Sequence, residues 1–377
     1  MTKQKKTCMN ILFVISTADV NSWVNIHIFD ELSSCGHSIL TFNIDLYSCK
    51  DQANSELLRK IKTDSPKIDL LVCFEGCSIF PEIIQGVKSH GTLTLLFLNN
   101  NLHVPYTDKD IAPFFDLVWL TSFETMSLIQ KWGCNCLFLP YAANPRLFKP
   151  IYRREIKGIG FIGNLYGTRS YKINDLLNAN IPCFVYSSSF SGSKTAKISP
   201  PLFSKIKISV DDLVLLKFSV GRRIIWSKVV KRFFMKQQQL LLSSPFLNQF
   251  PAVSFEEMNV LYSNFSISLG ITEVWDTYVL KRPIHKLHLR TFEIPMCGGL
   301  QLVPYIKELA GYFEEDKEII FYRSKEEYVD KAHYYLQDSK SQLRMAMKKA
   351  ARRHAEQEHT WSCRFDKIFS QLNLRKK

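Results

Sequence analysis

The organisation of this chain is clearest around Arg290-Thr-Phe-Glu-Ile-Pro-Met-Cys-Gly-Gly299, which leads directly into Leu300-Gln-Leu-Val303. Arg290 and Glu293 are three positions apart, so one helical turn places both side chains on the same face. The glycine pair ends that helix, because glycine adopts the left-handed conformation of a helix C-terminus. The stretch predicts a short charged helix that feeds a buried strand, with polar groups at the carboxyl edge of a sheet, where α/β proteins bind ligands.

Strand and helix patterns alternate outward from this stretch in both directions. Apolar runs predict strands at 10–16, 38–42, 68–74, 92–98, 117–121, 137–140, 158–163, 183–186, 265–269, 300–303 and 319–322. Periodic segments predict helices at 24–32, 55–62, 81–89, 125–131, 171–177, 256–262 and from 325 onward. This alternation predicts right-handed βαβ units around parallel sheets, and therefore an α/β fold.

A proline-rich segment divides the chain into two similar halves. Pro140 to Pro150 contains three prolines in eleven residues, which neither a helix nor a central strand accepts. At 377 residues the chain is long enough for about two domains. We predict an N-terminal domain at 9–150, a C-terminal domain at 151–350 with a basic insertion near 190–250, and a helical tail at 351–377.

The composition excludes several classes of protein. With 46% hydrophobic and 13% aromatic residues, the chain can bury a core and is not globally disordered. No apolar run approaches the roughly 18 residues of a membrane span, and the basic N-terminus lacks a signal-peptide core. The ten cysteines lie mostly in apolar runs and lack zinc-ligand spacing, so we expect reduced thiols, a cytoplasmic location and no metal.

Four residues near predicted strand ends are candidates for ligand binding, and the charged ones have a structural alternative. Gly163 lies where the chain turns after the strand at 158–163, and Arg169 lies near the start of the next helix. That Arg is either a surface residue or a partner for a diphosphate. Arg290 and Glu293 form either an ordinary surface ion pair or a ligand site in which the carboxylate holds ribose hydroxyls.

Motifs from Phe115 to Phe369 resemble those of the CgeB-like glycosyltransferases, within the wider group-1 family. They are Phe115-Asp-Leu-Val118, Pro140-Tyr-Ala-Ala-Asn-Pro145 with Phe148 and Pro150, Phe161-Ile-Gly163 with Arg169, Leu261-Tyr-Ser-Asn264, Leu289 to Gly299, Tyr334-Tyr-Leu336, and His359-Thr-Trp361 with Arg364. The resemblance implies a GT-B fold, in which two Rossmann-like α/β/α domains face a central cleft. It also implies that a nucleotide-sugar donor binds the C-terminal domain as substrate, without a metal or other cofactor.

The resemblance assigns roles to individual positions. Glu293 is expected to bind the donor ribose, and Arg290 and Arg169 to neutralise the leaving diphosphate. The full expected donor site consists of Gly163, Arg169, Arg290, Thr291, Glu293, Gly298 and Gly299, with backbone amides near Gly163 and Gly298 as further donors. The catalytic base stays open, because His103, Glu75 and His27 all lie near predicted strand ends in the N-terminal half and each has a structural alternative.

The net charge of +14 is concentrated in one segment. Residues 194–239 contain eight Lys and three Arg against two Asp. A helix from residue 225 would present an apolar face with Trp226 and Phe233 and a cationic face with Lys228, Lys231 and Arg232. This helix either packs on the protein body, binds nucleic acid, or anchors the protein on an anionic membrane, and the membrane is the interpretation we favour.

The predicted activity is therefore a metal-independent glycosyltransferase that moves a sugar from a nucleotide-activated donor to a glycan, lipid-linked or protein acceptor. The predicted location is the cytoplasm, at the cytosolic face of a membrane. Two alternatives stay open at this point. One is a catalytically silent GT-B module that binds a glycan or a partner, and the other is a nucleotide-sugar epimerase of the same fold.

Overall fold

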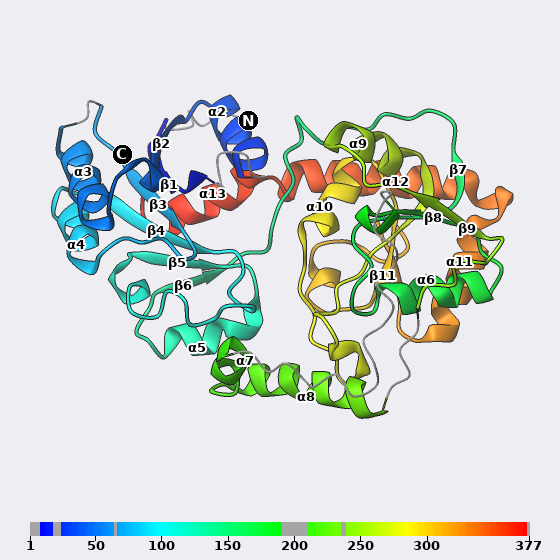
Figure 1. Ribbon diagram of the computed structural model, residues 1–377. Coiled ribbons are helices and arrows are strands. Elements are labelled where there is room, and N and C mark those ends of the chain that lie inside the picture. Colours follow the sequence, from blue (N-terminus) through cyan, green and yellow to red (C-terminus); the bar gives the residue numbers. More distant parts are fainter. Residues whose placement is uncertain (1–7, 18–23, 64–65, 191–209, 235–238, 375–377) are drawn as a thin grey trace. The chain divides into compact units, whose positions relative to one another are not determined.

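The computed structural model describes residues 8–17, 24–63, 66–190, 210–234 and 239–374. These residues form two compact units (Figure 1). Unit 1 consists of residues 1–147 and 360–377, and unit 2 of residues 148–359. The predicted tail at 351–377 is divided between them, because its last helix packs in unit 1 while the helix before it belongs to unit 2.

The sheet of unit 1 is parallel, with strand order β2-β1-β3-β4-β5-β6. Its strands are β1 (Asn10–Ile15), β2 (Ser38–Asn43), β3 (Leu70–Phe74), β4 (Leu93–Leu98), β5 (Leu117–Leu120) and β6 (Cys136–Phe138). Its helices are η1 (Asn25–Phe29, a π-helix), α2 (Asp30–Ser34), η2 (Ile44–Leu46), α3 (Lys50–Thr63), α4 (Pro81–Ser89), η3 (Ala112–Phe114), η4 (Phe123–Thr125), α5 (Met126–Gln130) and α13 (Trp361–Gln371).

Alternate residues of each central strand in unit 1 face different kinds of neighbour. Leu12 and Val14 share an aliphatic cluster with Leu57 of α3 and Ile84 of α4. Phe13, between them, points the other way and contacts Phe29, Phe74 and Phe365. This alternation explains why the strands are continuous apolar runs, since both faces of a parallel sheet are covered.

Helix α13 brings the end of the chain back into unit 1. The Glu31 carboxylate accepts the backbone N–H groups of Trp361 at 3.2 Å and Ser362 at 2.6 Å, at the start of α13. The Trp361 ring is buried against Trp119, with ring centroids 6.1 Å apart. This helix therefore belongs to the core of unit 1 although it lies more than 200 residues from the nearest other part of that unit.

The sheet of unit 2 is also parallel, with strand order β12-β11-β10-β7-β8-β9. Its strands are β7 (Ile156–Ile162), β8 (Cys183–Tyr186), β9 (Leu247–Phe250), β10 (Phe265–Leu269), β11 (Gln301–Pro304) and β12 (Ile320–Tyr322). Its helices are α6 (Arg169–Asn178), η5 (Ser188–Phe190), α7 (Val210–Leu215), α8 (Ser219–Phe234), α9 (Phe255–Asn264), η6 (Thr277–Val279), α10 (Leu289–Met296), η7 (Leu309–Gly311), α11 (Lys325–Leu336), η8 (Asp338–Lys340) and α12 (Ser341–Glu358).

The strand order of unit 2 is that of a dinucleotide-binding sheet, with β7 as its first strand. The chain runs from β7 outward through β8 to β9, and then returns to the other side of β7 with β10. Ligands bind such sheets at the carboxyl edge where the order reverses, which here is the end of β7. Gly160 lies within β7, where the ring of Phe265 occupies the space that a side chain would need. Glycine at this position therefore allows Phe265 to pack against the strand.

The sequence predicted eleven of these strands and missed β9. Leu247-Asn-Gln-Phe250 contains no continuous apolar run, because β9 is the edge strand and its two central residues are exposed. The predicted alternation of strand and helix is otherwise confirmed in both halves. The two parallel α/β units required by the predicted fold class are therefore present.

Candidate functional site

Unit 2 contains a hollow of about 540 Å³ at the carboxyl edge of its sheet. Ile162 and Tyr186, the last residues of β7 and β8, form part of its wall, and residues 252–255 follow β9 around it. Its complete lining is Ile162, Gly163, Asn164, Tyr166, Arg169, Tyr186, Ser187, Ser188, Ala252, Val253, Ser254, Phe255, Met258 and Arg290. The hollow thus lies where the reversal of strand order predicts a ligand site.

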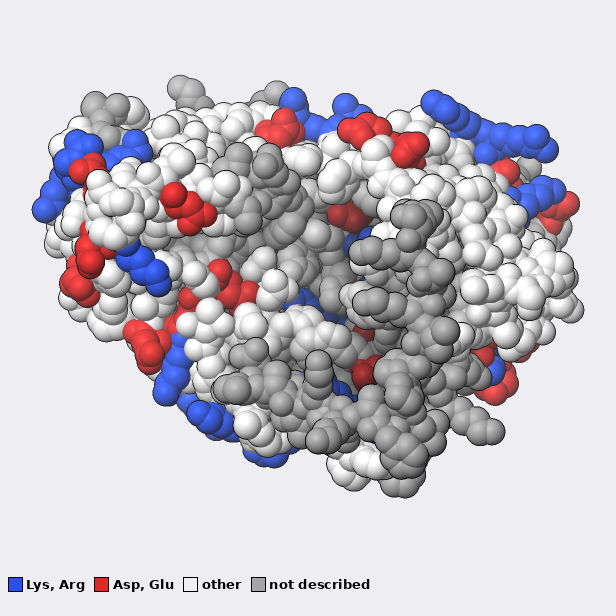
Figure 2. All heavy atoms as spheres, viewed as in Figure 1, with Lys and Arg blue, Asp and Glu red and all other residues white. Residues whose placement is uncertain are grey.

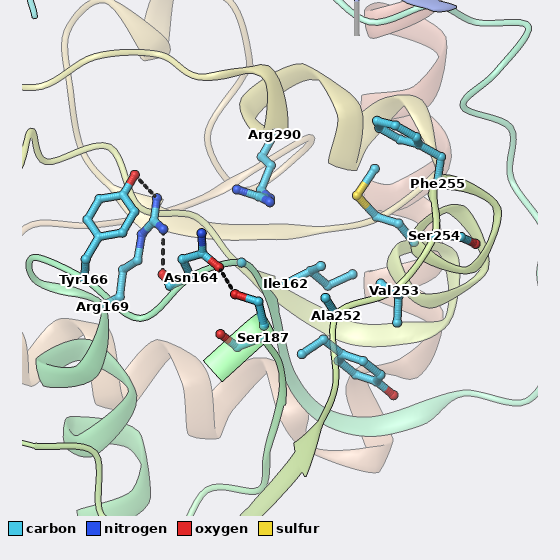
Figure 3. A pocket seen from close by; sticks show the side chains of 14 residues that line it. Ile162, Asn164, Tyr166, Arg169, Ser187, Ala252, Val253, Ser254, Phe255 and Arg290 are labelled. Atoms are coloured by element: carbon cyan, nitrogen blue, oxygen red, sulfur yellow. Dashed lines mark hydrogen bonds between the residues drawn. The ribbon is translucent and has the colours of Figure 1, made fainter. Parts of the chain in front are cut away.

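Arg290 extends into this hollow from the first turn of α10 (Figure 3). Its Nε donates a hydrogen bond to the hydroxyl of Tyr262 at 3.1 Å. Gly163, with φ of +150°, makes room for it, since a Cβ at that position would lie 3.2 Å from Arg290 Nη1. Burial acts to lower the pKa of Arg290, but Tyr262 and Glu293 together raise it above its usual value. Arg290 is therefore held as a charged group at a fixed place.

Arg169 presents a second guanidinium to the same hollow from the start of α6 (Figure 3). Its Nη1 donates to the Asn164 carbonyl at 2.6 Å, and its Nη2 donates to the Tyr166 hydroxyl at 3.0 Å. The guanidinium carbon lies 3.8 Å from the centre of the Tyr166 ring. Burial lowers the pKa of Arg169, and the charge of Arg290 lowers it further.

Two guanidinium groups that face one hollow favour an anionic ligand. The two positive charges repel each other, and a bound anion between them would offset that repulsion. Planar guanidinium groups match the paired oxygens of phosphate, and both of these are held by hydrogen bonds before any ligand arrives. The geometry therefore suits a phosphate or diphosphate group.

The remaining walls of the hollow differ in chemistry. Asn164 and Ser188 join across its floor, where the Ser188 hydroxyl donates to Asn164 Oδ1 at 2.7 Å. Ser254 caps α9 through a capping box with Glu257, so the positive end of that helix dipole meets the hollow. Val253 and Met258 add an apolar surface. The hollow thus combines a cationic end with an apolar wall, as a nucleotide requires.

The structure brings together part of the predicted donor site. Gly163, Arg169 and Arg290 line the hollow as expected. Glu293 and Thr291 are buried within unit 2 and do not belong to its lining. The Glu293 side chain is 4% exposed, and burial raises its pKa to about 7 although the charge of Arg290 acts in the opposite direction.

The glycine backbone amides are used within the fold. The Gly163 N–H donates to the Tyr186 carbonyl at 2.8 Å as part of the sheet edge. The N–H groups of Gly298 and Gly299 donate to the carbonyls of Pro295 and Ile294 at 2.9 and 2.8 Å, which ends α10. The expected donors near Gly163 and Gly298 are therefore not the amides of Gly163, Gly298 and Gly299 themselves. The function of these glycines is to allow close packing and the turn after the helix.

The three candidates for a catalytic base lie in different environments of unit 1. Glu75 follows β3, and its carboxylate accepts the Asn100 N–H at 2.6 Å in the turn that includes His103. Both therefore lie at the carboxyl edge of that sheet. His27 is fully buried in η1, edge-on to the Trp361 ring, and burial lowers its pKa to about 4. A buried neutral imidazole of this kind is a core residue.

The predicted membrane-facing residues are divided between two sides of α8. Trp226 and Phe233 are exposed, as expected. Lys228 and Arg232 are half-buried. Lys231 turns toward unit 2 and pairs with Asp276 at 2.6 Å, so it differs from the predicted outward cation. Parts of the predicted basic insertion, 191–209 and 235–238, lie outside the described residues.

Several residues of the hollow were missed from the sequence. The Ser254-x-x-Glu257 capping box was readable as a helix start, which would have placed α9 and its N-terminus. Tyr166 and Tyr262 carried no such signal, because their contacts with the two arginines depend on tertiary packing. Asn164 and Ser188 are polar residues in loops and are recognised by their position at adjacent strand ends.

No group of three or more His, Cys, Asp or Glu side chains in the described part of the chain is arranged to hold a metal ion. No helix in it has the length and hydrophobicity needed to cross a membrane.

Residues 234–370 match a protein family described as glycosyl transferase-like. The match covers less than half of the chain and includes α9, α10 and the strands β9 to β12. No curated protein sequence matches the chain. The sequence comparison therefore relates most of unit 2, with the stretch around Arg290, to glycosyltransferases.

Solved structures of glycosyltransferases resemble the whole chain. Sucrose-phosphate synthase from Thermosynechococcus elongatus is 12% identical, with a TM-score of 0.56, over 97% of this chain and 99% of that chain. A glycosyltransferase from Rickettsia africae is 11% identical, with a TM-score of 0.55, over 98% and 100%. HepE from Anabaena, solved with UDP-glucose, is 9% identical, with a TM-score of 0.53, over 97% and 99%.

At these identities the likeness shows the fold. The two parallel sheets with flanking helices, together with these neighbours, give the chain the two-domain GT-B fold that the resemblance implied. The family match adds a glycosyl transferase-like region in unit 2. Fold and family match together support a glycosyltransferase.

Proposed function

We propose that this protein transfers a sugar from a nucleoside diphosphate-sugar to an acceptor hydroxyl, with the donor bound in the hollow of unit 2. The observation that carries the proposal is the pair of guanidinium groups, Arg169 and Arg290, at the carboxyl edge of the sheet. The family match, the CgeB-like motif around Arg290 and a structural neighbour solved with UDP-glucose support it. We further propose unit 1 as the acceptor domain and the cytoplasm as the location, which suits ten free cysteines.

The two arginines would act on the leaving group. In the transfer, the bond between the anomeric carbon and the diphosphate oxygen breaks, and its electron pair leaves with the diphosphate. The acceptor oxygen forms the new bond to that carbon and gives up its proton. Positive groups already fixed beside the diphosphate stabilise its growing negative charge without reorganisation. Since the two guanidinium groups supply this charge, we propose a metal-independent reaction.

For Glu293 the structure favours a role through Arg290. The predicted role is direct binding of the donor ribose, but the side chain is buried and does not line the hollow. Its negative charge raises the pKa of Arg290, whose guanidinium does line the hollow. We therefore propose Glu293 as a positioning residue that, with Tyr262, keeps Arg290 charged and in place.

Titration calorimetry of UDP, GDP, ADP and dTDP tests donor binding. We expect one nucleotide to bind, and Arg290→Ala or Arg169→Ala to weaken it roughly 10- to 100-fold, the range for a hydrogen bond to a charged group. Arg146→Ala is the matched control, because this exposed arginine pairs with Asp30 in unit 1. Absence of binding by every nucleotide, or equal binding by all variants, contradicts the proposal.

The 2′-deoxy form of the same nucleotide separates the two roles of Glu293. If Glu293 holds the ribose hydroxyls, Glu293→Gln weakens the ribonucleotide more than the deoxyribonucleotide, which has already lost its 2′-hydroxyl. If it acts through Arg290, both lose affinity by the same factor, while the nucleoside without phosphates is unaffected. The second result is the one we expect.

Product analysis separates the proposed enzyme from the two alternatives. A glycosyltransferase releases nucleoside diphosphate from the donor, slowly to water and faster with its acceptor. An epimerase changes the sugar and retains its bond to the diphosphate, and a silent module leaves the donor intact. If the wild type releases nucleoside diphosphate and the Arg290→Ala variant does not, the result supports a glycosyltransferase.

A further inference from the structure

The helices α7 and α8 form an insertion between the adjacent strands β8 and β9 (Figure 1). One side of α8 packs on unit 2, where Ile224 and Ser227 are fully buried. On the same side Lys231 pairs with Asp276, and Arg223 donates to the Arg282 carbonyl. Helix α8 is therefore fixed to the body of unit 2 by its inner side, and its outer side stays at the surface.

The outer side of α8 exposes large apolar side chains. Trp226 is 56% exposed and Phe233 is 68% exposed. They are seven residues apart, which places them two turns apart on one helix face. Leu213 on α7 is 53% exposed, and Leu216, directly after α7, is 42% exposed. Two large aromatic side chains exposed on one face of a helix mark an interaction surface, because isolated exposed residues are ordinary and groups of them are not. Leu213 and Leu216 add exposed apolar side chains to the same insertion.

This apolar surface lies within the most basic part of the sequence. From Asp211 to Phe234 there are six Lys or Arg residues and two Asp, and across residues 194–239 there are eleven basic residues and two acidic ones. Even with Lys231 neutralised by Asp276, positive charge is in excess. Arg222, one turn before Trp226, is exposed. Figure 2 shows the distribution of Lys, Arg, Asp and Glu over the described surface of one face of the molecule.

Exposed apolar side chains surrounded by positive charge are complementary to the surface of an anionic lipid bilayer. In the interface of an anionic bilayer, Trp and Phe enter the boundary between headgroups and acyl chains, and Lys and Arg meet the lipid charges. A second copy of this chain would present the same excess of positive charge, which opposes self-association through this face. Single-stranded nucleic acid would satisfy the charge and stack its bases on Trp226 and Phe233, but it would leave the aliphatic Leu213 and Leu216 exposed.

We propose that α7 and α8 dock unit 2 on an anionic lipid bilayer, with Trp226 and Phe233 inserted at the interface. This proposal stands on exposure and charge and does not depend on donor binding. Lys231, in contrast to the sequence prediction, acts in this arrangement by holding α8 to unit 2.

Flotation of the full chain with vesicles tests the proposal. One set of vesicles consists of phosphatidylcholine, and the other contains about 30% phosphatidylglycerol, a content that gives the bilayer a negative surface potential. We expect binding to the anionic vesicles, weak binding to the neutral ones, and a decrease with added salt. A Trp226→Ser, Phe233→Ser variant should bind at least roughly tenfold more weakly, because two interfacial aromatic groups are lost.

Phe123→Ser is the matched control, because Phe123 is 61% exposed in unit 1 and should not affect binding. Vesicles with brominated acyl chains should quench tryptophan fluorescence in the wild type, and Trp226→Phe should abolish that quenching. Equal binding of the double variant, equal binding to neutral vesicles, or quenching unchanged in Trp226→Phe would overturn the proposal. Two further results would overturn the proposal. One is a dimer in sedimentation that the double variant does not form, and the other is binding to RNA, without binding to vesicles, that the double variant loses.

Discussion

The two sheets have similar architectures and end differently at their carboxyl edges. In unit 1 the loop after β4 closes over the edge, since Glu75 accepts the Asn100 N–H and the hydroxyls of Thr121 and Tyr141 donate to the Asn99 carbonyl. In unit 2 the corresponding edge is a hollow that two arginines enter. At the carboxyl edge of the unit 1 sheet, polar groups are therefore hydrogen-bonded to other residues of the same unit. At the corresponding edge of unit 2, two positive side chains line a hollow that is open to a ligand.

The acidic groups of unit 1 illustrate the same difference. Both oxygens of the Asp108 carboxylate lie 3.0 Å from the Gly76 nitrogen. Burial raises the pKa of Asp108 to about 6, although the Gly76 hydrogen bond opposes that shift. This carboxylate joins two loops at the edge of unit 1. A strand edge in a GT-B fold is thus a place where polar groups gather, and only the chemistry of the groups shows whether they bind the chain itself or a ligand.

The largest expected effects concern the two buried titratable groups, which give the units opposite responses to pH. Burial lowers the pKa of His27 in unit 1 from 6.5 to about 4. The contribution of His27 to the stability of unit 1 is therefore fully present above pH 6.5 and is lost as the pH falls toward 4, by about 3 kcal/mol, because the unfolded histidine binds a proton that the folded one excludes. Urea unfolding of His27→Phe should show this slope removed.

The exposed His90 is the control for that experiment, since His90→Gln should leave the slope between pH 6.5 and 4 in place. A wild-type slope that persists in His27→Phe would show that another group is responsible. Because the two units can unfold in separate steps, the transition of unit 1 is the one to follow.

Glu293 in unit 2 should produce a change of similar size and opposite sign. Burial raises its pKa from 4.5 to about 7, opposed by the charge of Arg290. The folded state therefore retains a proton that the unfolded state loses, so its contribution is fully present below pH 4.5 and is lost as the pH rises through 7, by about 3 kcal/mol. The stability of Glu293→Gln should lack this decrease.

Glu256→Gln provides a matched carboxylate, exposed on α9 of the same unit, and should keep the wild-type profile. If stability relative to Glu293→Gln stays constant from pH 4.5 to 7.5, the buried carboxyl is ionised throughout, and its proposed effect on Arg290 becomes stronger than the structure indicates.

The fold could be predicted from sequence because its signals are local and repeated. Two α/β halves are predicted from continuous apolar runs, the helical segments between them and a proline-rich linker. None of these signals requires knowledge of contacts between distant residues. β9 was missed because its central residues are polar and exposed at the sheet edge. The return of α13 to unit 1 was not predicted either, because it depends on the contact of Trp361 with Trp119, which are 242 positions apart in the sequence.

The site could be predicted in part. Gly163, Arg169 and Arg290 were found because each lies beside a strand end or a glycine that the sequence marks. The spacing of Arg290 and Glu293 correctly places them on one helix turn, but spacing does not show that the carboxylate is buried and the guanidinium lines the hollow. The four-residue spacing in α8 likewise predicted an apolar face and a cationic face. It did not show that Lys231 faces inward, which follows from its ion pair with Asp276.

The smallest expected effect comes from Arg169→Lys, which keeps the charge of the unit 2 edge and changes its shape. Arg169 stacks on the Tyr166 ring as a planar group and reaches the Asn164 carbonyl and the Tyr166 hydroxyl with two separate nitrogens, whereas lysine has no planar group and a single nitrogen. We expect the bound nucleotide to lose about 1 kcal/mol, roughly a fivefold rise in Kd, which is less than for Arg169→Ala. Lys172→Arg, on the same helix and paired with Glu273, is the control. Equal affinity of Arg169→Lys and wild type would mean that the site recognises charge alone, whereas equal losses in the Lys and Ala variants would mean that it recognises the planar fork and that charge adds little.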